Sequence, residues 1–130
     1  MSLSTRDLAG TYAKAWASHD VDAIIALHTP DSVFHVHGLT DPATGLKAIG
    51  DAIADMFAHA PDLHFETSRG HLGADHIVFE YLMSGTSDGT PFGCDGVDVI
   101  AVHEGLVQRK DTYLDLAAYQ RQGLPGFSPE

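Results

Sequence analysis

The sequence predicts a single α+β domain in which helices cover one face of a curved antiparallel sheet. Before Pro61, apolar residues recur at helical spacing; after it they alternate as in strands, with turn residues between the alternating segments. The chain has 130 residues, enough for one domain with a substantial core and too few for two. We therefore treat residues 1–130 as one domain.

The first predicted helix begins at a capping box, in which Ser4 precedes Asp7 by three residues. Leu8, Tyr12 and Trp16 then recur every four residues and share one face of the helix. We expect this face to point into the core.

Two more helices and a strand are expected before Pro61. Asp20 can cap a short helix over residues 21–28. Residues 32–37 (SVFHVH) alternate and are rich in β-branched and aromatic side chains, so they predict a strand. A third helix follows Gly45, with apolar residues at helical spacing, and ends at Pro61.

The second half of the chain predicts a run of antiparallel strands. Asp88-Gly89 and Glu104-Gly105 are turn signals that join neighbouring strands into hairpins. One of these strands, GVDVIAVH, is apolar on both faces and should lie centrally in its sheet. The expected strands cover residues 63–69, 76–85, 96–103 and 106–115, followed by a short helix and a mobile tail at 123–130.

The composition excludes several classes of partner. Lys and Arg number 7 against 18 Asp and Glu, a net charge of −11, so nucleic acid and anionic membrane surfaces are poor partners. No apolar run approaches the length of a membrane span, and no secretory signal is visible, so we expect a cytoplasmic protein. The single cysteine, Cys94, excludes an internal disulfide.

Asp98 is the most informative candidate residue. It lies in the middle of the apolar strand, where removal from water favours the neutral form of a carboxyl group. Such a group could act as an acid, or donate a hydrogen bond to a developing oxyanion. The alternative is a structural carboxylate that pairs with Arg109 of the next strand, or one near the rim that stays wet.

Asp111 is a second candidate. Simple alternation places it on one face with Val107, Arg109 and Tyr113. If the last two strands pair through the Glu104-Gly105 turn, Asp111 could lie near Asp98 and form an acid–base pair with it. An ion pair between Arg109 and Asp111 at the sheet edge is the alternative.

Tyr12 and two histidines complete the set of candidates. A buried phenol needs a hydrogen-bond partner, and a pocket carboxylate would suit Tyr12, although a tyrosine in such a stripe more often only packs. His35 and His37 point the same way along one strand, a spacing that metal ions can use. No third ligand is evident, so the sequence predicts no metal site and favours a pair at the pocket rim or facing outward.

Several segments together resemble a known family. Their order and spacing are similar to those of SnoaL-like polyketide cyclases and ketosteroid isomerases, in the nuclear transport factor 2-like superfamily, over nearly the whole chain. The resemblance implies a cone-shaped barrel, with a curved antiparallel sheet wrapped around three N-terminal helices and an apolar cavity at the wide end; it also implies a homodimer. The segments are TYAKAWASHDVDAIIALHTPDSVF, GLKAI, GVDVI, EGLVQRKDTYLD and LAAYQRQGLP.

The resemblance also implies roles for single residues. Tyr12 and Asp98 fall where ketosteroid isomerases place the tyrosine and the protonated aspartic acid of their oxyanion hole. The general base of those enzymes would fall near Val36, which cannot move a proton, so His35 is the candidate substitute. Asp111 falls close to the acid–base aspartate of SnoaL-like cyclases.

These observations predict a small-molecule enzyme, an isomerase, cyclase or related lyase, acting on an apolar ligand that carries a carbonyl or hydroxyl group. Its catalytic residues would be Asp98, Tyr12, Asp111 and His35, with no cofactor and no metal. The alternative is a non-catalytic ligand-binding or dimerisation module on the same fold. The expected pocket walls are Trp16, Phe34, Val36, Met56, Phe57, Phe65, Phe79, Tyr81, Met83, Ile100 and Tyr113.

Overall fold

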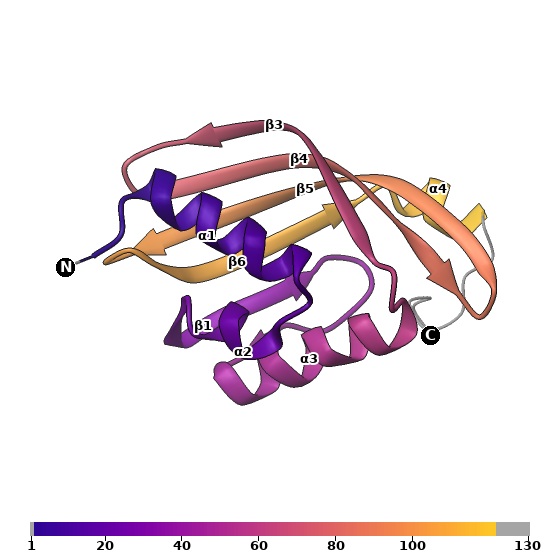
Figure 1. Ribbon diagram of the computed structural model, residues 1–130, viewed down its shortest axis with the longest axis horizontal. Helices are drawn as coiled ribbons and strands as arrows, with labels where there is room; N and C mark the ends of the chain where they lie inside the picture. The colour runs from indigo at the N-terminus through magenta and orange to yellow at the C-terminus, as the bar shows by residue number, and fades with distance from the viewer. Residues whose placement is uncertain (1, 122–130) are drawn as a thin grey trace.

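The computed structural model describes residues 2–121, so the tail expected at 123–130 lies outside the described residues. Three N-terminal helices lie along one face of a curved sheet (Figure 1). In chain order the elements are α1 (Thr5–Ala17), α2 (Val21–Ile25), β1 (His28–Val36), β2 (Ala43–Thr44), α3 (Leu46–His59), β3 (His64–Leu72), β4 (His76–Ser87), β5 (Thr90–His103), β6 (Leu106–Leu114) and α4 (Leu116–Arg121).

The predicted α+β class is confirmed. The sheet has six strands in the order β2-β1-β6-β5-β4-β3. Neighbouring strands are antiparallel except β1 and β6, which run parallel. β5 lies inside the sheet, as its apolar sequence predicted, because it pairs with β4 on one side and β6 on the other. Within residues 2–121, no helix is long and apolar enough to cross a membrane.

The predicted helix starts are also confirmed. Ser4 accepts a hydrogen bond from the backbone N–H of Asp7, and Asp20 caps α2 in the same way. Leu8, Tyr12 and Trp16 are all buried on the sheet side of α1. This single apolar stripe therefore positions two aromatic side chains over the inner face of the sheet.

The boundary between α2 and β1 differs from the prediction. The helix ends at Ile25, and β1 begins at His28, four residues before the expected start of the strand. The pairing of β1 with β6 is irregular between His28 and Val33, and Pro30 lies in this stretch. A proline is tolerated there because no regular ladder requires its missing N–H. His28 is consequently buried beside the core instead of ending a helix.

β5 also begins earlier than predicted, at Thr90 instead of residue 96. Pro91 and Gly93 are uncommon in strands, so the sequence of residues 90–95 did not predict one. In the structure this segment pairs residue by residue with the end of β4. The predicted turn is present: Asp88 and Gly89 have φ values of 49° and 79°, as a two-residue hairpin turn requires.

A β-bulge interrupts the pairing of β5 with β6. Val102 pairs with Val107, whereas the adjacent Ala101 pairs with Arg109. One step along β5 therefore corresponds to two steps along β6, and Gln108 is the extra residue. Because side chains alternate strictly along a strand, this insertion reverses which residues face inward.

The bulge corrects one sequence prediction. Val107 is fully buried, and beyond the bulge Lys110 and Thr112 are the buried residues. Asp111 faces outward with Tyr113, whose side chain is 48% exposed. The prediction that Val107, Asp111 and Tyr113 share one face is therefore wrong, because alternation was extended across an irregularity.

The outer face of the sheet carries exposed apolar side chains, among them Leu82, Val99 and Tyr113. The inner face packs against the helices and forms the core around Trp16 and Ile100. The expected homodimer stays a prediction.

Candidate functional site

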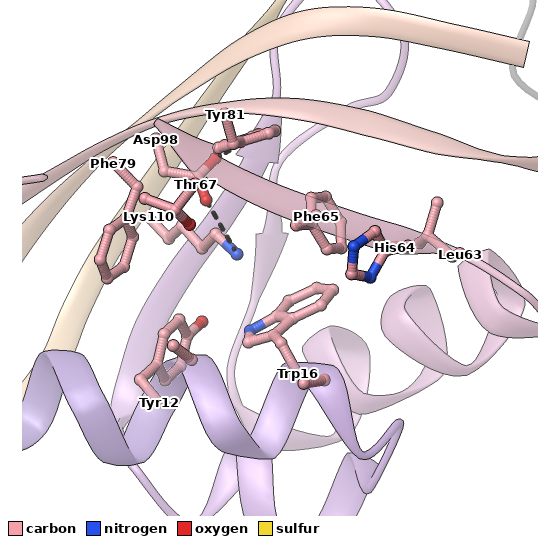
Figure 2. Close-up of a pocket in the computed structure, with 12 residues that line it drawn as sticks. Tyr12, Trp16, Leu63, His64, Phe65, Thr67, Phe79, Tyr81, Asp98 and Lys110 are labelled. Atoms are coloured by element: carbon pink, nitrogen blue, oxygen red, sulfur yellow. Dashed lines mark hydrogen bonds and ion pairs between the residues drawn. The ribbon is translucent and has the colours of Figure 1, made fainter. Parts of the chain in front are cut away.

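An apolar cavity of about 80 Å³ lies between α1 and the inner face of the sheet (Figure 2). Its lining residues are Tyr12, Ala13, Trp16, Ala17, Leu63, His64, Phe65, Thr67, Phe79, Tyr81, Asp98 and Lys110. A smaller cavity of about 20 Å³ shares part of this lining and adds Phe34, Val36, Met56, Met83, Thr112 and Leu114. An engineered cavity of about 150 Å³ in another protein holds benzene, so the larger cavity suits a smaller molecule or one end of a larger one.

An ion pair closes the inner end of this cavity. The Nζ atom of Lys110 lies 3.4 Å from Oδ2 of Asp98, and their side chains are only 6% and 9% exposed. The ammonium group also lies 3.8 Å from the ring centroid of Trp16, and 5.2 Å from those of Tyr12 and Phe34. A carboxylate and three aromatic rings thus replace most of the water around this charge.

The burial of Lys110 changes its acidity. Loss of hydration lowers the pKa of Lys110 below its ordinary value, and the attraction of Asp98 offsets this only in part. Lys110 therefore releases its proton more readily than a lysine on the protein surface. A lysine with this property can serve in acid–base chemistry.

Asp98 accepts hydrogen bonds instead of donating them. The Tyr81 hydroxyl and the Thr112 hydroxyl donate to its Oδ1 atom at 2.8 and 2.7 Å. Burial and the Asp98 charge raise the pKa of Tyr81, which keeps the phenol protonated as a donor. The Lys110 ammonium faces the other oxygen, Oδ2, so each contact that Asp98 makes here is with a donor, whereas the sequence led us to expect Asp98 itself to donate.

Tyr12 takes part in a second buried chain of polar groups. Its hydroxyl lies 2.9 Å from Nε2 of His28, and Nδ1 of His28 lies 3.2 Å from the hydroxyl of Ser32. Burial and the nearby charge of Lys110 lower the pKa of His28 to about 3, so the imidazole is neutral at neutral pH. Burial also raises the pKa of Tyr12. The partner of Tyr12 is thus a neutral imidazole and not the carboxylate that the sequence suggested.

Two further polar groups face the cavity. The indole N–H of Trp16 is buried and makes no hydrogen bond of good geometry within the described part of the chain. Figure 2 shows this nitrogen on the edge of the ring nearest Tyr12 and Lys110. His64 lies at the other end of the site, where it is exposed to solvent. The cavity therefore offers an unused donor inside and an imidazole at its edge.

Most of the predicted pocket walls do line the two cavities: Trp16, Phe34, Val36, Met56, Phe65, Phe79, Tyr81 and Met83. Three predicted walls do not. Phe57 packs behind Trp16 and stacks against the ring of His19 at a centroid distance of 4.0 Å. Ile100 is fully buried in the core, and Tyr113 lies on the outer face of the sheet. Alternation along a strand shows which residues face inward. It does not distinguish a residue that lines a cavity, such as Tyr81 on β4, from one buried in the core, such as Ile100 on β5.

Asp98 and Asp111 do not meet, so the predicted carboxylate pair is wrong. Asp98 lies opposite Thr112 in the antiparallel register, whereas Asp111 lies opposite Val99 on the other face. The Nε and Nη2 atoms of Arg109 donate to both carboxylate oxygens of Asp111, at 2.8 and 3.0 Å. The alternative, an ion pair between Arg109 and Asp111, describes the structure.

His35 is also outside the cavity. Its Nε2 donates to the backbone carbonyl of Thr40 at 3.0 Å, and its ring lies 3.8 Å from that of His37. His35 on β1, and His37 just after the end of that strand, lie on the outer side of the sheet, while Phe34 and Val36 face inward. The alternation of this strand was predicted correctly, and it places His35 on the face opposite the cavity.

Four residues at or beside the two cavities were not predicted from the sequence: Lys110, Thr112, His28 and His64. Lys110 and Thr112 were not among the candidates, because no residue between 106 and 109 signals the bulge that turns them inward. His28 was placed at the end of a helix. His64 directly precedes Phe65, and a histidine beside this predicted wall residue was a usable signal.

The model of the SnoaL-like domain matches residues 9–110, so this chain belongs to the SnoaL-like family. This confirms the predicted resemblance to the nuclear transport factor 2-like superfamily. No curated protein matches the chain significantly.

Solved structures show the same fold. A hypothetical protein of ketosteroid isomerase-like fold from Catenulispora acidiphila, in complex with trimethylamine, has a TM-score of 0.83 at 22% identity, covering 93% of this chain and 95% of that one. A SnoaL-like polyketide cyclase candidate from Shewanella putrefaciens has a TM-score of 0.81 at 16% identity, covering 91% and 94%. An epoxide hydrolase from M. tuberculosis has a TM-score of 0.77 at 14% identity, covering 91% and 86%. At these identities the likeness establishes the fold alone.

Proposed function

We propose that this SnoaL-like domain is an enzyme that binds a small, largely apolar molecule by a carbonyl or hydroxyl oxygen and moves a proton on it, as an isomerase, cyclase or lyase does. One observation carries this proposal. Lys110 and Trp16 each bring a hydrogen-bond donor to the same apolar cavity, and the hydroxyl of Tyr12, which is bonded to His28, lies beside them. Such a cluster of donors stabilises negative charge that develops on a substrate oxygen.

The surroundings of Lys110 strengthen this effect. Its ammonium is held in place by Asp98 and by the face of Trp16, so it need not reorganise when a charge forms beside it. A ligand oxygen would also give the unused N–H of Trp16 an acceptor, which removes the cost of burying that donor. Asp98 acts through Lys110 and is a positioning residue in this scheme.

Besides stabilising charge on the substrate oxygen, the reaction needs a group that moves a proton to or from carbon. His64 fits this role because it lies at the exposed edge of the cavity and can exchange a proton with water. Burial lowers the pKa of Lys110, which suits it to pass a proton to an enolate oxygen. Asp111 and His35 have no part in this mechanism, since they lie on the opposite face of the sheet.

The size of the cavity limits the ligand. A volume of about 80 Å³ accepts a small molecule or the functional end of a larger one. The relative from Catenulispora acidiphila binds trimethylamine, which is also small. A small ketone, enone or phenol is the class that best fits the cavity and its donors.

A binding module without catalysis is the second candidate. Among the residues that line the larger cavity, Asp98 is the only carboxylate, and it is already paired with Lys110. A tightly paired carboxylate is a poor general base. On this view, the donors would hold a ligand and transfer no proton.

Trp16 is the single tryptophan of the sequence and lines the cavity, so its fluorescence can report ligand binding. We would titrate the protein with small phenols and cyclic ketones and follow tryptophan fluorescence. Deuterium uptake at the α-carbon of each ketone in D2O, followed by NMR, measures proton transfer directly. The unaltered protein should show saturable binding and catalysed exchange.

Lys110→Met should lower the exchange rate by roughly 100-fold and weaken the binding of phenolates, because it removes the ammonium that stabilises negative oxygen. Lys47→Met is the matched control, since Lys47 is exposed and pairs only with Asp51 in the described structure. Binding without exchange in the unaltered protein would favour the binding module. Equal behaviour of the two lysine variants would contradict the proposal.

A further inference from the structure

We propose that His35, His37 and Asp111 form a binding site for Zn²⁺ on the outer face of the sheet. One nitrogen of each histidine and one oxygen of the carboxylate lie within 4.8 Å of one another. All three residues are partly buried. The site lies on the face opposite the cavity and is independent of the proposed catalysis.

The fold supplies the ligand that the sequence lacked. His35 lies on β1, and His37 follows the last residue of that strand. The backbone N–H of His37 still donates to the carbonyl of Thr112 on β6, and the two histidine rings lie 3.8 Å apart, so both are on the same side of the sheet. β1 pairs in parallel with β6, and this register places His35 directly opposite Asp111. The bulge in β6 turns Asp111 to the same outer face. A third ligand therefore comes from a strand more than seventy residues away, as the separation of 74 between His37 and Asp111 shows.

The histidine rings are already oriented. A carbonyl oxygen can only accept, so the Nε2 of His35 must carry the proton that it donates to Thr40, and its Nδ1 keeps a free lone pair. Metal-binding histidines commonly use their second nitrogen in this way. The ring of His37 stacks on Tyr113, with a centroid distance of 4.3 Å and an angle of 12°. Little side-chain freedom remains to be lost when an ion binds.

The chemistry of the three ligands selects the ion. Two imidazole nitrogens and one carboxylate oxygen suit Zn²⁺ and similar transition metals, whereas Mg²⁺ and Ca²⁺ prefer oxygen ligands alone. His37 Nε2 lies 2.7 Å from Asp111 Oδ1. Two ligand atoms on a tetrahedral zinc ion lie about 3.3 Å apart. The two side chains therefore need to move apart only slightly for the ion to bind between them. Three protein ligands leave a fourth position for water.

Arg109 competes with a metal ion for the carboxylate of Asp111. Its guanidinium group donates to both oxygens of Asp111, and its side chain is 44% exposed. A metal ion must share the carboxylate with this positive charge. Removing the charge by Arg109→Gln should therefore tighten zinc binding, which a non-specific histidine site elsewhere would not show.

The same molecule contains a matched control. His71 lies 2.7 Å from Glu80, and Arg69 donates to the other oxygen of that carboxylate at 2.8 Å. This group repeats the histidine, carboxylate and arginine of the proposed site without the second histidine. His71→Gln therefore separates a true two-histidine site from ordinary histidine–carboxylate pairs.

The test is calorimetric titration of Zn²⁺ into the full chain without a histidine tag. We expect about one ion per chain. His35→Gln and His37→Gln should each weaken binding at least about tenfold, Arg109→Gln should strengthen it, and His71→Gln should leave it unchanged. The proposal is overturned if His71→Gln weakens binding as much as His37→Gln, or if both His35→Gln and His37→Gln bind like the unaltered protein.

A second measurement needs no variant and keeps the proposal testable if a substitution unfolds the chain. Co²⁺ replaces Zn²⁺ in nitrogen and oxygen sites, and its visible spectrum reports the ligands. The unaltered protein should give a band distinct from that of aqueous Co²⁺, and Zn²⁺ should remove it. A spectrum equal to that of aqueous Co²⁺ would overturn the site, while the ketone-exchange assay would be unaffected and would still test the cavity.

Discussion

At the scale of single residues, two titratable groups are held away from water beside the cavity. Lys110 lies next to Asp98 and three aromatic rings, and burial lowers its pKa, while His28 is buried as a neutral imidazole. The two groups influence each other, because the charge of Lys110 helps to lower the pKa of His28. A positive charge on Lys110 thus disfavours a second one on His28.

His28 should make stability depend on acid. Its pKa falls from 6.5 to about 3 in the folded chain, so the unfolded chain takes up a proton between these values and the folded chain does not. The free energy of unfolding should therefore be highest above pH 6.5 and fall by roughly 3 kcal/mol by pH 4.5 through this group alone. Urea unfolding at pH 7.5 and 4.5 measures it. His28→Gln should lose less stability over this range, and an equal loss in both proteins would contradict the assignment.

At the scale of elements, the inner surface depends on how β4, β5 and β6 fit together. The ring of Tyr81 on β4 lies over Gly96 of β5, which has no side chain to obstruct it. This close approach accompanies the hydrogen bond from Tyr81 to Asp98. On the other side of β5, the bulge in β6 turns Lys110 and Thr112 toward the same carboxylate. Packing of strands, rather than any one motif, assembles the polar end of the cavity.

Gly96→Ala should therefore destabilise the fold and disturb the site. The added Cβ would lie 2.7 Å from a ring carbon of Tyr81 and 2.8 Å from Leu114, so the ring must move. We expect a loss of about 1–3 kcal/mol in thermal or urea unfolding. Gly93→Ala in the same strand is the control, because its Cβ would meet only ordinary contacts at 3.7 Å or more. A Gly96→Ala protein as stable as the Gly93→Ala protein would show that the close approach is unimportant.

At the scale of the whole molecule, the sheet separates two environments. Its inner face is covered by the N-terminal helices (Figure 1). This face also holds the cavity and the buried ion pair. Its outer face carries the ion pairs of Arg109 and Glu80, together with exposed apolar residues. The strands also differ in how many neighbours they pair with. β5 is paired on both sides, whereas β3 pairs only with β4 within the described sheet.

Amide hydrogen exchange should follow this arrangement. We expect β5 to exchange most slowly and β3 much faster, because the residues of β3 are nearly all exposed and its hydrogen bonds open without unfolding the core. A ligand in the cavity should slow exchange around Phe65 and Thr67, which line it. Mass spectrometry of peptic peptides can measure both effects. Equal protection of β3 and β5 would contradict the expectation.

The sequence alone determined most of the framework. The capping residues, the stripe of Leu8, Tyr12 and Trp16, and the two-residue turns are local signals, and each was confirmed. The central place of β5 followed from its apolar composition on both faces. Tyr12 and Asp98 were also correctly placed at the cavity, since each lies on a regular element whose inward face the pattern identifies.

Only the tertiary structure decided which charged groups meet. Lys110 reaches Asp98 and Asp111 turns away because of one extra residue in β6, and an insertion of this kind leaves no mark on composition or alternation. The pairing of His35 with Asp111 likewise depends on the parallel register of β1 and β6, strands far apart in the chain. Local sequence sets the inward face of a regular strand, but register and bulges are settled by the packing of one strand against the next.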